Sequence, residues 1–233
     1  MRRRLDRPGP ETARGRLTAR PGREPAKALA AGLHTLAVPG SRDALLYIPR
    51  AVDATAKVPL IVSLHGAGGN APNGIHILQA QADQYDFAVL APASHRATWD
   101  FIAGGYGPDV AALDHSLSET FRSLNVRPES TAISGFSDGA SYALSIGIAN
   151  GDLFHDILAF SPGFLSPPSE QGRPRVFISH GNRDAVLPIR DCSRVIVPKL
   201  RKAGYDVTYR EFNGPHTAPA DIKEEAMRWW LRR

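Results

Sequence analysis

The sequence contains a single cysteine, Cys192, among its 233 residues. It can therefore form no intrachain disulfide and no zinc site built from several cysteines. No apolar run approaches the roughly 20 residues that a membrane-spanning helix needs, so we expect no membrane span. Glycine and proline are frequent but recur without a fixed period, which excludes a collagen-like repeat. A globular, cytoplasmic protein is the default expectation.

Positive charge is concentrated at the start of the chain. Residues 1–27 hold nine Lys/Arg and three Asp/Glu, whereas the remaining residues hold 19 and 20. Because this first segment is rich in Arg, Pro and Gly, it lacks the apolar side chains to form a core. We therefore predict a disordered tail over residues 1–27, native or resulting from a start set too far upstream, and one domain over residues 28–233.

Three other interpretations of the tail stay open. Arg neutralises phosphates, so the tail could contact nucleic acid or another anionic surface, although we expect no nucleic-acid partner. The run of Arg2, Arg3 and Arg4 is similar to an export signal, but no uninterrupted apolar run follows promptly. Organelle targeting is the third interpretation, which the Pro and Gly content opposes.

Short apolar runs alternate with amphipathic segments through the rest of the chain. Nearly continuous apolar runs are typical of strands buried on both faces of a parallel sheet. The alternation predicts an α/β fold with a mostly parallel sheet of about seven to eight strands and helices on both faces. The predicted strands are residues 34–38, 44–48, 58–64, 87–91, 131–134, 157–160, 176–179 and 207–212, and the predicted helices are residues 74–84, 109–125, 138–149, 189–203 and 219–232.

A nucleophile motif lies between a predicted strand and a predicted helix. Residues 135–139 read Gly-Phe-Ser-Asp-Gly, which matches G-x-S-x-G. A serine on such a tight turn takes strained backbone angles, so large side chains at the two glycine positions would clash. Ser137 is therefore the candidate nucleophile. A glycine-rich loop that binds an anion at the helix start is the alternative.

A second glycine-rich segment follows the strongest buried strand, in Leu-His-Gly-Ala-Gly-Gly at residues 64–69. Such a loop can direct backbone N–H groups toward the negative charge that develops during acyl transfer. The candidate donors of this oxyanion hole are the N–H groups of Ala67 and Asp138. A phosphate-binding loop is the alternative, but the segment lacks both common phosphate-loop patterns.

A serine nucleophile needs a base, and the base needs a partner that fixes its tautomer. His216 follows the last predicted strand, and Asp184 follows the strand before it, which gives the chain order Ser, Asp, His. His65 and His180 are expected to brace the glycine loop and the acid loop. No metal site is predicted, because there is no H-E-x-x-H pair and no compact cluster of ligand residues. No cofactor is implied.

These motifs carry a family resemblance over residues 34 to 232. Residues 59–66, 135–139, 180–184 and 214–216 resemble signatures of the α/β-hydrolase superfamily, with the small phospholipase/carboxylesterase-type and polyhydroxybutyrate-depolymerase-like esterases closest. The resemblance implies hydrolysis of a small-molecule carboxylic ester through an acyl-enzyme. It implies Ser137 as nucleophile, His216 as base and later acid, and Asp184 as its orienter.

One residue departs from that pattern. Many carboxylesterases of this type carry Gln after the nucleophile, whereas this chain has Asp138. A carboxylate whose own N–H faces a developing oxyanion should turn its side chain away, although the first turn of a helix favours a negative charge. Asp138 therefore puts the substrate range in question, especially for long-chain lysophospholipids.

The spacing of the motifs indicates an open site without a cap domain. Residues 161–175 form a Pro-rich connection that is too short for a helical cap. Phe164 and Leu165 in this connection, and Trp99 after an earlier strand, are the candidate substrate-binding residues. Ordinary packing is the alternative for both Trp99 and Phe164.

The leading interpretation is a serine esterase, and two alternatives remain. A serine peptidase or amidase could use the same fold and the same three side chains. A catalytically silent binding module, with the basic tail as its nucleic-acid contact, is the second alternative. Helix faces and edge strands could pair two copies into a homodimer, but nothing in the sequence specifies this.

Overall fold

The computed structural model describes residues 10–22, 28–53 and 56–232. Its strands form one eight-stranded sheet with the order β1-β2-β4-β3-β5-β6-β7-β8. Strand β2 is antiparallel to β1 and β4, and every other neighbouring pair is parallel. The prediction of a mostly parallel sheet is confirmed. The strands are β1 (Gly32–Leu36), β2 (Ala44–Ile48), β3 (Val58–Leu64), β4 (Ala88–Ala91), β5 (Val126–Phe136), β6 (Asp156–Phe160), β7 (Arg175–Gly181) and β8 (Val207–Phe212).

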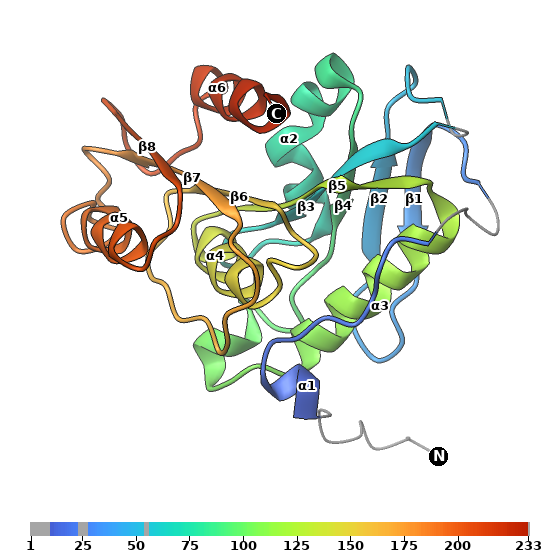
Figure 1. Ribbon diagram of the computed structural model, residues 1–233, viewed down its shortest axis with the longest axis horizontal. Coiled ribbons are helices and arrows are strands. Elements are labelled where there is room, and N and C mark those ends of the chain that lie inside the picture. Colours follow the sequence, from blue (N-terminus) through green and yellow to red (C-terminus); the bar gives the residue numbers. More distant parts are fainter. Residues whose placement is uncertain (1–9, 23–27, 54–55, 233) are drawn as a thin grey trace.

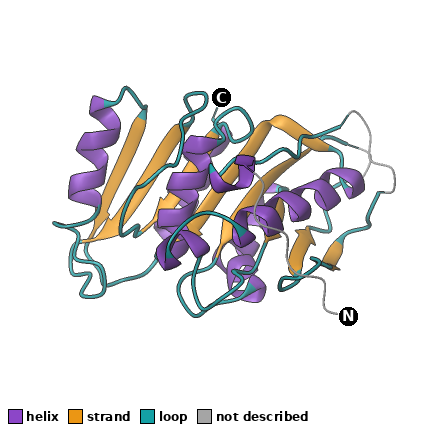
Figure 2. Cartoon of the chain, turned by 90° about the horizontal axis from the view of Figure 1, so that it is seen from below, coloured by secondary structure: helices purple, strands orange, loops and turns teal. Residues whose placement is uncertain are grey.

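Helices cover both faces of the sheet (Figure 1). Helices α3, α4 and α5 lie side by side across one face, as the view from below shows (Figure 2), and α2 and α6 lie on the other. The sheet is therefore the middle layer of a three-layer α/β fold. The helices are α1 (Pro10–Ala13), α2 (Ala71–Tyr85), α3 (Pro108–Ser123), α4 (Asp138–Ala149), α5 (Ser193–Lys202) and α6 (Ala220–Leu231), with a short 3₁₀-helix η1 (Asp100–Ala103).

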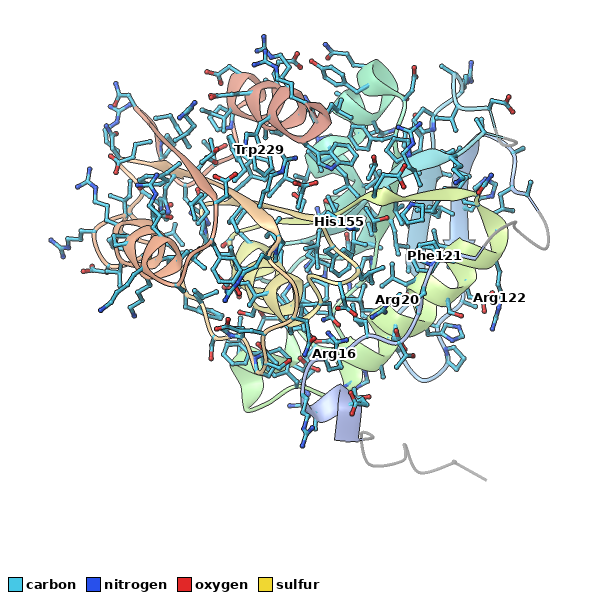
Figure 3. All side chains as sticks on the ribbon, viewed as in Figure 1. Arg16, Arg20, Phe121, Arg122, His155 and Trp229 are labelled. Carbon is cyan, nitrogen blue, oxygen red and sulfur yellow. The ribbon has the colours of Figure 1, made fainter. Side chains whose placement is uncertain are left out.

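The apolar core has two parts, one on each face of the sheet. All residues of β3 are buried, because helices cover both of its faces. On the α3–α4–α5 face the core includes Phe121, which lies between α3 and the sheet (Figure 3). On the α2–α6 face, the rings of Phe87 and Trp230 meet edge to face with centroids 5.2 Å apart. Burial of these side chains is the main source of stability.

Element boundaries differ from the sequence-based expectation where polar residues determine them. Helix α2 begins at Ala71 rather than at residue 74, because the Asn70 side chain accepts a hydrogen bond from the Asn73 backbone N–H, and the Asn73 side chain accepts one from the Asn70 N–H. Such a reciprocal cap satisfies N–H groups that the first helical turn leaves free. The apolar periodicity used for the prediction does not register a polar cap.

Residues 10–22, which we call the N-terminal strap, differ from the expected disordered tail. The Leu17 side chain is only 1% exposed and belongs to the core on the α3–α4–α5 face. The Leu17 N–H donates to Asn150 Oδ1 at 2.8 Å, and the Ala19 N–H donates to Asp114 Oδ1 of α3 at 2.8 Å. The strap is therefore part of the domain rather than an appendage to it.

Charged contacts also hold the strap in place. Arg16 and Arg20 both pair with Asp152, which follows α4, at 2.9 and 2.5 Å. Figure 3 shows both arginines where the strap crosses this face of the domain. Part of the tail's positive charge thus has partners within the fold, which composition alone could not show. The remaining parts of the predicted tail, residues 1–9 and 23–27, lie outside the described residues.

We expect Leu17→Ala to lower the free energy of unfolding by about 2–4 kcal/mol, because it leaves a cavity in a packed core. Urea denaturation followed by circular dichroism measures this change. Leu33→Ala, at a side chain that is 57% exposed, is the control and should cost less than about 0.5 kcal/mol. Equal and small effects of the two substitutions would mean that the strap does not pack on the domain in solution.

The ion pairs of the strap should also make stability depend on pH. Arg16 and Arg20 lower the pKa of Asp152 to about 2, from an ordinary value of 3.8. The carboxylate therefore stabilises the fold above pH 4, and this contribution is lost as the pH falls toward 2. We expect the urea midpoints of wild type and Asp152→Asn to differ at pH 6, to differ less at pH 3, and to converge only as the pH falls to about 2. Asp206→Asn makes the same change at an exposed residue and is the matched control, and parallel curves for wild type and Asp152→Asn would contradict the expectation.

Candidate active site

Ser137 occupies the sharp turn between β5 and α4, as the motif predicts. Its backbone has φ 58° and ψ −122°, a positive φ that is rare for residues other than glycine. The Ser137 N–H donates to the carbonyl oxygen of Phe160 at 3.0 Å, which fixes the turn to the end of β6. Backbone strain of this kind persists only where the surrounding structure holds it, and it occurs often at functional sites.

Gly139 lets α4 approach the neighbouring strand β3. A Cβ atom at this position would clash with the carbonyl oxygens of Leu64 and His65. Strands β3 and β5 pair with Leu64 opposite Gly135, so the glycine loop after β3 lies beside the serine turn. A Cβ atom built on Gly66 would lie 3.4 Å from the Ser137 Cβ. The two glycine-rich segments found in the sequence are therefore neighbours in space.

Three side chains from distant parts of the chain meet at this turn. His216 Nε2 lies 2.9 Å from Ser137 Oγ, and His216 Nδ1 lies 2.6 Å from Asp184 Oδ2. The Asp184 side chain is fully buried, whereas that of His216 is 13% exposed. The phenyl ring of Phe136 packs against the imidazole, with centroids 4.7 Å apart. The arrangement forms a hydrogen-bonded row with the serine hydroxyl at its open end.

The topology of the sheet explains why the three side chains meet. Strands β5, β7 and β8 are parallel members of one sheet, so their carboxyl ends lie on the same edge. The loop that carries His216 packs on the loop that carries Asp184. A Cβ atom at Gly181 would clash with the carbonyl oxygens of Gly214 and Pro215, so this close approach requires glycine.

The Asp184 carboxylate is held in its charged form. Its Oδ1 accepts hydrogen bonds from the N–H groups of Val186 and Leu187 at 2.9 and 2.8 Å. Burial opposes the charge, but the hydrogen bonds from Leu187, His216 and Val186 outweigh it and hold the pKa of Asp184 below its ordinary value. A charged carboxylate beside Nδ1 favours the tautomer in which Nε2 can accept a proton from Ser137.

The two candidate oxyanion donors belong to the glycine loop after β3 and to the first residue of α4. Neither the Ala67 N–H nor the Asp138 N–H has a hydrogen-bond partner within the described part of the chain. The Asp138 carboxylate accepts a hydrogen bond from Thr98 Oγ1 at 2.7 Å, so its side chain is engaged by a neighbouring loop. Thr98 carried no motif, and only its position beside Asp138 in the fold identifies it.

His65 braces the glycine loop. Its Nε2 accepts the N–H of Ser94 at 3.0 Å, so its Nδ1–H donates to the Gly66 carbonyl oxygen at 2.7 Å. Burial lowers the pKa of His65, which keeps this imidazole neutral. The neutral ring therefore fixes the loop through two hydrogen bonds that both need the same tautomer.

The structure corrects the expectation that Trp99 contacts substrate. Its side chain is 1% exposed and lies between the rings of His65 and Tyr142, at centroid distances of 4.8 and 4.9 Å. Its Nε1–H donates to the carbonyl oxygen of His65 at 3.0 Å. The indole thus packs against the glycine loop, as expected if Trp99 has an ordinary packing role rather than a substrate-binding role. Its position after a strand did not reveal which way the side chain points.

Phe164 and Leu165 are half-buried in the connection from β6 to β7. The Gly163 N–H donates to Ser141 Oγ of α4 at 2.9 Å, which places this segment over the first turns of that helix. The Phe164 ring contacts that of Phe101 with centroids 5.3 Å apart, and Leu165 packs against the core. Residues 161–174 contain no helix or strand. A role of the two side chains in substrate binding stays a prediction.

The described residues contain neither a cluster of metal ligands nor a helix that could span a membrane. No three His, Cys, Asp or Glu side chains there gather in an arrangement that could hold a metal ion. None of the described helices combines the length and the apolar character needed to cross a bilayer.

No family model matches the chain. A probable feruloyl esterase C of Aspergillus niger is 30% identical over 169 residues, which cover 69% of this chain and 60% of that protein. The chain thus spans about three fifths of the length of this curated relative.

Solved structures agree with the fold described above. The crystal structure of esterase PE8 superposes with a TM-score of 0.64 at 24% identity, covering 87% of this chain and 97% of that one. A thermostable esterase superposes with a TM-score of 0.67 at 21% identity, covering 86% and 62%. The sheet order and the serine turn described above are consistent with these similarities to solved esterases. The chain has an α/β-hydrolase fold, and in sequence it is similar to feruloyl esterases.

Proposed function

We propose that this protein hydrolyses carboxylic esters through an acyl-enzyme intermediate. The observation that carries the proposal is the row of Ser137, His216 and Asp184, in which each neighbouring pair is within hydrogen-bond distance. Ser137 is the nucleophile, His216 the general base and acid, and Asp184 the residue that orients His216. The serine on a strand-to-helix turn and the esterase relatives support the same assignment.

In the acylation step, Ser137 Oγ attacks the carbonyl carbon of the ester. His216 Nε2 accepts the hydroxyl proton as the new C–O bond forms, and the carbonyl oxygen becomes an oxyanion. The C–O bond to the alcohol then breaks, and His216 gives its proton to the leaving alkoxide. The products of this step are a free alcohol and an acyl ester on Ser137. The Asp184 carboxylate stabilises the imidazolium that exists between the two proton transfers.

The N–H groups of Ala67 and Asp138 are the proposed donors to the oxyanion. Both are free of protein partners in the described part of the chain, which leaves them available to a ligand oxygen. Loss of a single such donor typically costs about 3 kcal/mol of transition-state stabilisation. The positive end of α4, which begins at Asp138, adds to the stabilisation.

Deacylation repeats the same proton transfers with water in place of Ser137. A water molecule attacks the acyl carbon while His216 Nε2 accepts one of its protons. The bond to Ser137 Oγ breaks, and His216 returns the proton to the serine. The acid is released and the free enzyme is restored. The 13% exposure of the His216 side chain is compatible with water reaching this imidazole.

Esters of aromatic acids are the substrates that we propose to test first. The curated relative is named a feruloyl esterase, and ferulic acid carries an aromatic acyl group. Aromatic side chains also gather near the site: Phe136 packs on His216, and Phe101 contacts both Phe164 and Tyr106. A cavity of about 180 Å³ is lined in part by Thr98, the residue that binds Asp138 beside the nucleophile. The lining of this cavity includes neither Ser137 nor His216 nor these aromatic side chains, so the choice of substrate rests on the relative and on the aromatic contacts.

A substrate panel tests the proposal. We expect turnover of p-nitrophenyl acetate and butyrate and of methyl ferulate by the purified protein, and covalent labelling of Ser137 by a fluorophosphonate probe. Peptide and anilide substrates in the same panel test the peptidase alternative. A folded protein that cleaves none of the esters and resists the probe would overturn the proposal. Faster cleavage of amides than of matched esters would replace esterase with amidase.

The remaining expectations from the sequence stay predictions. A cytoplasmic location is tested by cell fractionation, and a homodimer by size-exclusion chromatography with light scattering. A salt-dependent shift of DNA mobility that is lost on deletion of residues 1–27, in a protein that stays folded by circular dichroism and has no esterase activity, would support the nucleic-acid alternative.

A further inference from the structure

A second buried histidine contacts the acid of the site. His180 lies in β7, four residues before Asp184, and its side chain is fully buried. Its Nε2 lies 3.1 Å from Asp184 Oδ2 and 2.8 Å from the carbonyl oxygen of Leu187. Its Nδ1 lies 2.6 Å from Ser193 Oγ of α5. The proposed mechanism does not use this residue.

The partners of His180 determine its tautomer. A carbonyl oxygen can only accept a hydrogen bond, so the contact with Leu187 requires a proton on Nε2. The neutral ring then has a lone pair on Nδ1, which accepts a hydrogen bond from the hydroxyl group of Ser193. Burial is the main reason that the pKa of His180 lies below its ordinary value, so the ring stays neutral. The Nε2–H therefore donates to the carbonyl oxygen of Leu187, and Asp184 Oδ2 lies 3.1 Å from the same nitrogen.

The two imidazoles share one carboxylate oxygen. Asp184 Oδ2 contacts both His216 Nδ1 and His180 Nε2, while Oδ1 accepts two backbone N–H groups. Donors therefore surround the carboxylate on both oxygens, which fixes its orientation. We propose that His180 is a positioning residue of the site, which donates to Asp184 Oδ2 and so limits how strongly that oxygen attracts the proton on His216. This inference rests on the proposed function.

The proposal predicts the direction of a pKa change. A hydrogen bond from His180 withdraws negative charge from the oxygen that stabilises the His216 imidazolium. Removing the donor should therefore raise the pKa of His216. A base whose pKa is too high is protonated over more of the pH range, so His180 would extend the activity toward lower pH.

Other titratable groups near His180 do not titrate in the neutral range. Glu211 of β8 pairs in register with His180, but its ion pair with Arg194 holds the pKa of that carboxyl below its ordinary value. Cys192, at the start of α5, is a buried thiol whose pKa is raised by burial. The charge on Asp184 is likewise constant there. These three groups are therefore not expected to account for a change in the pH profile of the variants.

Three variants separate positioning from packing. His180→Gln keeps an N–H donor at about the place of Nε2. His180→Asn is polar but too short to reach Asp184, and His180→Leu fills the space without a donor. If the imidazole serves only to fill the core, Gln and Leu should behave alike. If it acts through its N–H, Gln should retain wild-type behaviour while Asn and Leu should not.

Two measurements read the effect. An NMR titration of the His216 imidazole in the ¹⁵N-histidine-labelled protein without substrate should show the pKa rise by about 0.5–1 in the Leu and Asn variants. The acid limb of the kcat/KM profile for p-nitrophenyl butyrate should move by the same amount. We also expect kcat to fall about tenfold in these variants with KM nearly unchanged, because the misplaced base affects the transition state more than binding. His180→Gln should stay within about twofold of wild type on both readouts.

The outcomes are distinguishable. An unchanged His216 pKa in folded His180→Asn or His180→Leu protein would overturn the inference, as would equal shifts in the Gln and Leu variants. If the Leu variant does not fold, the comparison of Asn with Gln decides alone. The NMR titration needs no turnover. If the protein hydrolyses no ester but the variants show the pKa shift, the proposed function is refuted and the proposed role of His180 at Asp184 stands. If the protein is an active esterase but the variants show no shift, the proposed function stands and the role of His180 is refuted.

Discussion

Ser137→Ala is expected to lower kcat/KM for p-nitrophenyl esters by about 10⁴-fold or more, since without Oγ no acyl-enzyme can form. The residual rate would come from bound ester meeting water in the oxyanion hole. Fluorophosphonate labelling should disappear with the same substitution. The fold should be retained, because the hydroxyl contacts His216 at the surface of the site and fills no core space. Ester hydrolysis followed at 405 nm, with circular dichroism of the same sample, measures both effects.

Ser118→Ala is the matched control for this result. Ser118 lies on α3, and the same hydroxyl is deleted there from a partly exposed residue. We expect activity within about twofold of wild type, as for most surface substitutions. If Ser137→Ala retained more than a tenth of the wild-type activity, Ser137 would not be the nucleophile. Labelling of another serine in the wild type would then identify the residue that is.

Asp184→Asn should reduce kcat by about 10³–10⁴-fold, because it changes which ring nitrogen of His216 carries the proton. The N–H groups of Val186 and Leu187 require an acceptor at the Oδ1 position, so the amide oxygen of the new residue stays there. Its NH₂ group then faces His216 Nδ1 and donates to it. Nδ1 becomes the acceptor, the proton moves to Nε2, and Nε2 can no longer accept a proton from Ser137. The wrong tautomer, rather than a displaced ring, causes the loss.

The control for this variant lies on the same loop. Asp191 is an exposed carboxylate that pairs with Arg190 at the surface, and Asp191→Asn removes a charge of the same sign. We expect its kcat to stay within about twofold of wild type, because exposed ion pairs contribute little. Histidine-labelled NMR spectra should show the proton of His216 on Nδ1 in wild type and on Nε2 in Asp184→Asn. Full activity of Asp184→Asn would show that another group orients the base.

The strap shows where composition misleads about order. Arg, Pro and Gly dominate residues 1–27, and a segment of this composition has too few apolar side chains to fold alone. Leu17 nevertheless lies in the core, because its side chain packs among buried residues of the domain. The N–H groups of Leu17 and Ala19 also find side-chain acceptors in the domain. The polar partners of the strap lie on α3 or directly after α4, at Asp114, Asn150 and Asp152. No count over the segment itself could therefore have revealed it.

Trp99 and His180 show that the sequence locates a residue better than it orients a side chain. Trp99 follows strand β4 and His180 lies near the end of β7, so both are near the carboxyl ends of strands, where the sequence places the site. The direction of each side chain depends on packing against elements far away in the chain. Tyr142 of α4 stacks on Trp99 and helps to bury it, and Ser193 of α5 fixes the ring of His180.

The order of strands and helices, the serine turn and the chain order of Ser137, Asp184 and His216 could all be predicted from the sequence. These features depend on local patterns: apolar periodicity, glycines at a tight turn, and polar residues directly after strands. Only the tertiary structure decided that the strap is part of the domain, that Trp99 is buried, and that two imidazoles share the carboxylate of Asp184. The physical reason is that burial and hydrogen-bond partners are supplied by segments distant in sequence, whereas local pattern reports only what a segment can do by itself.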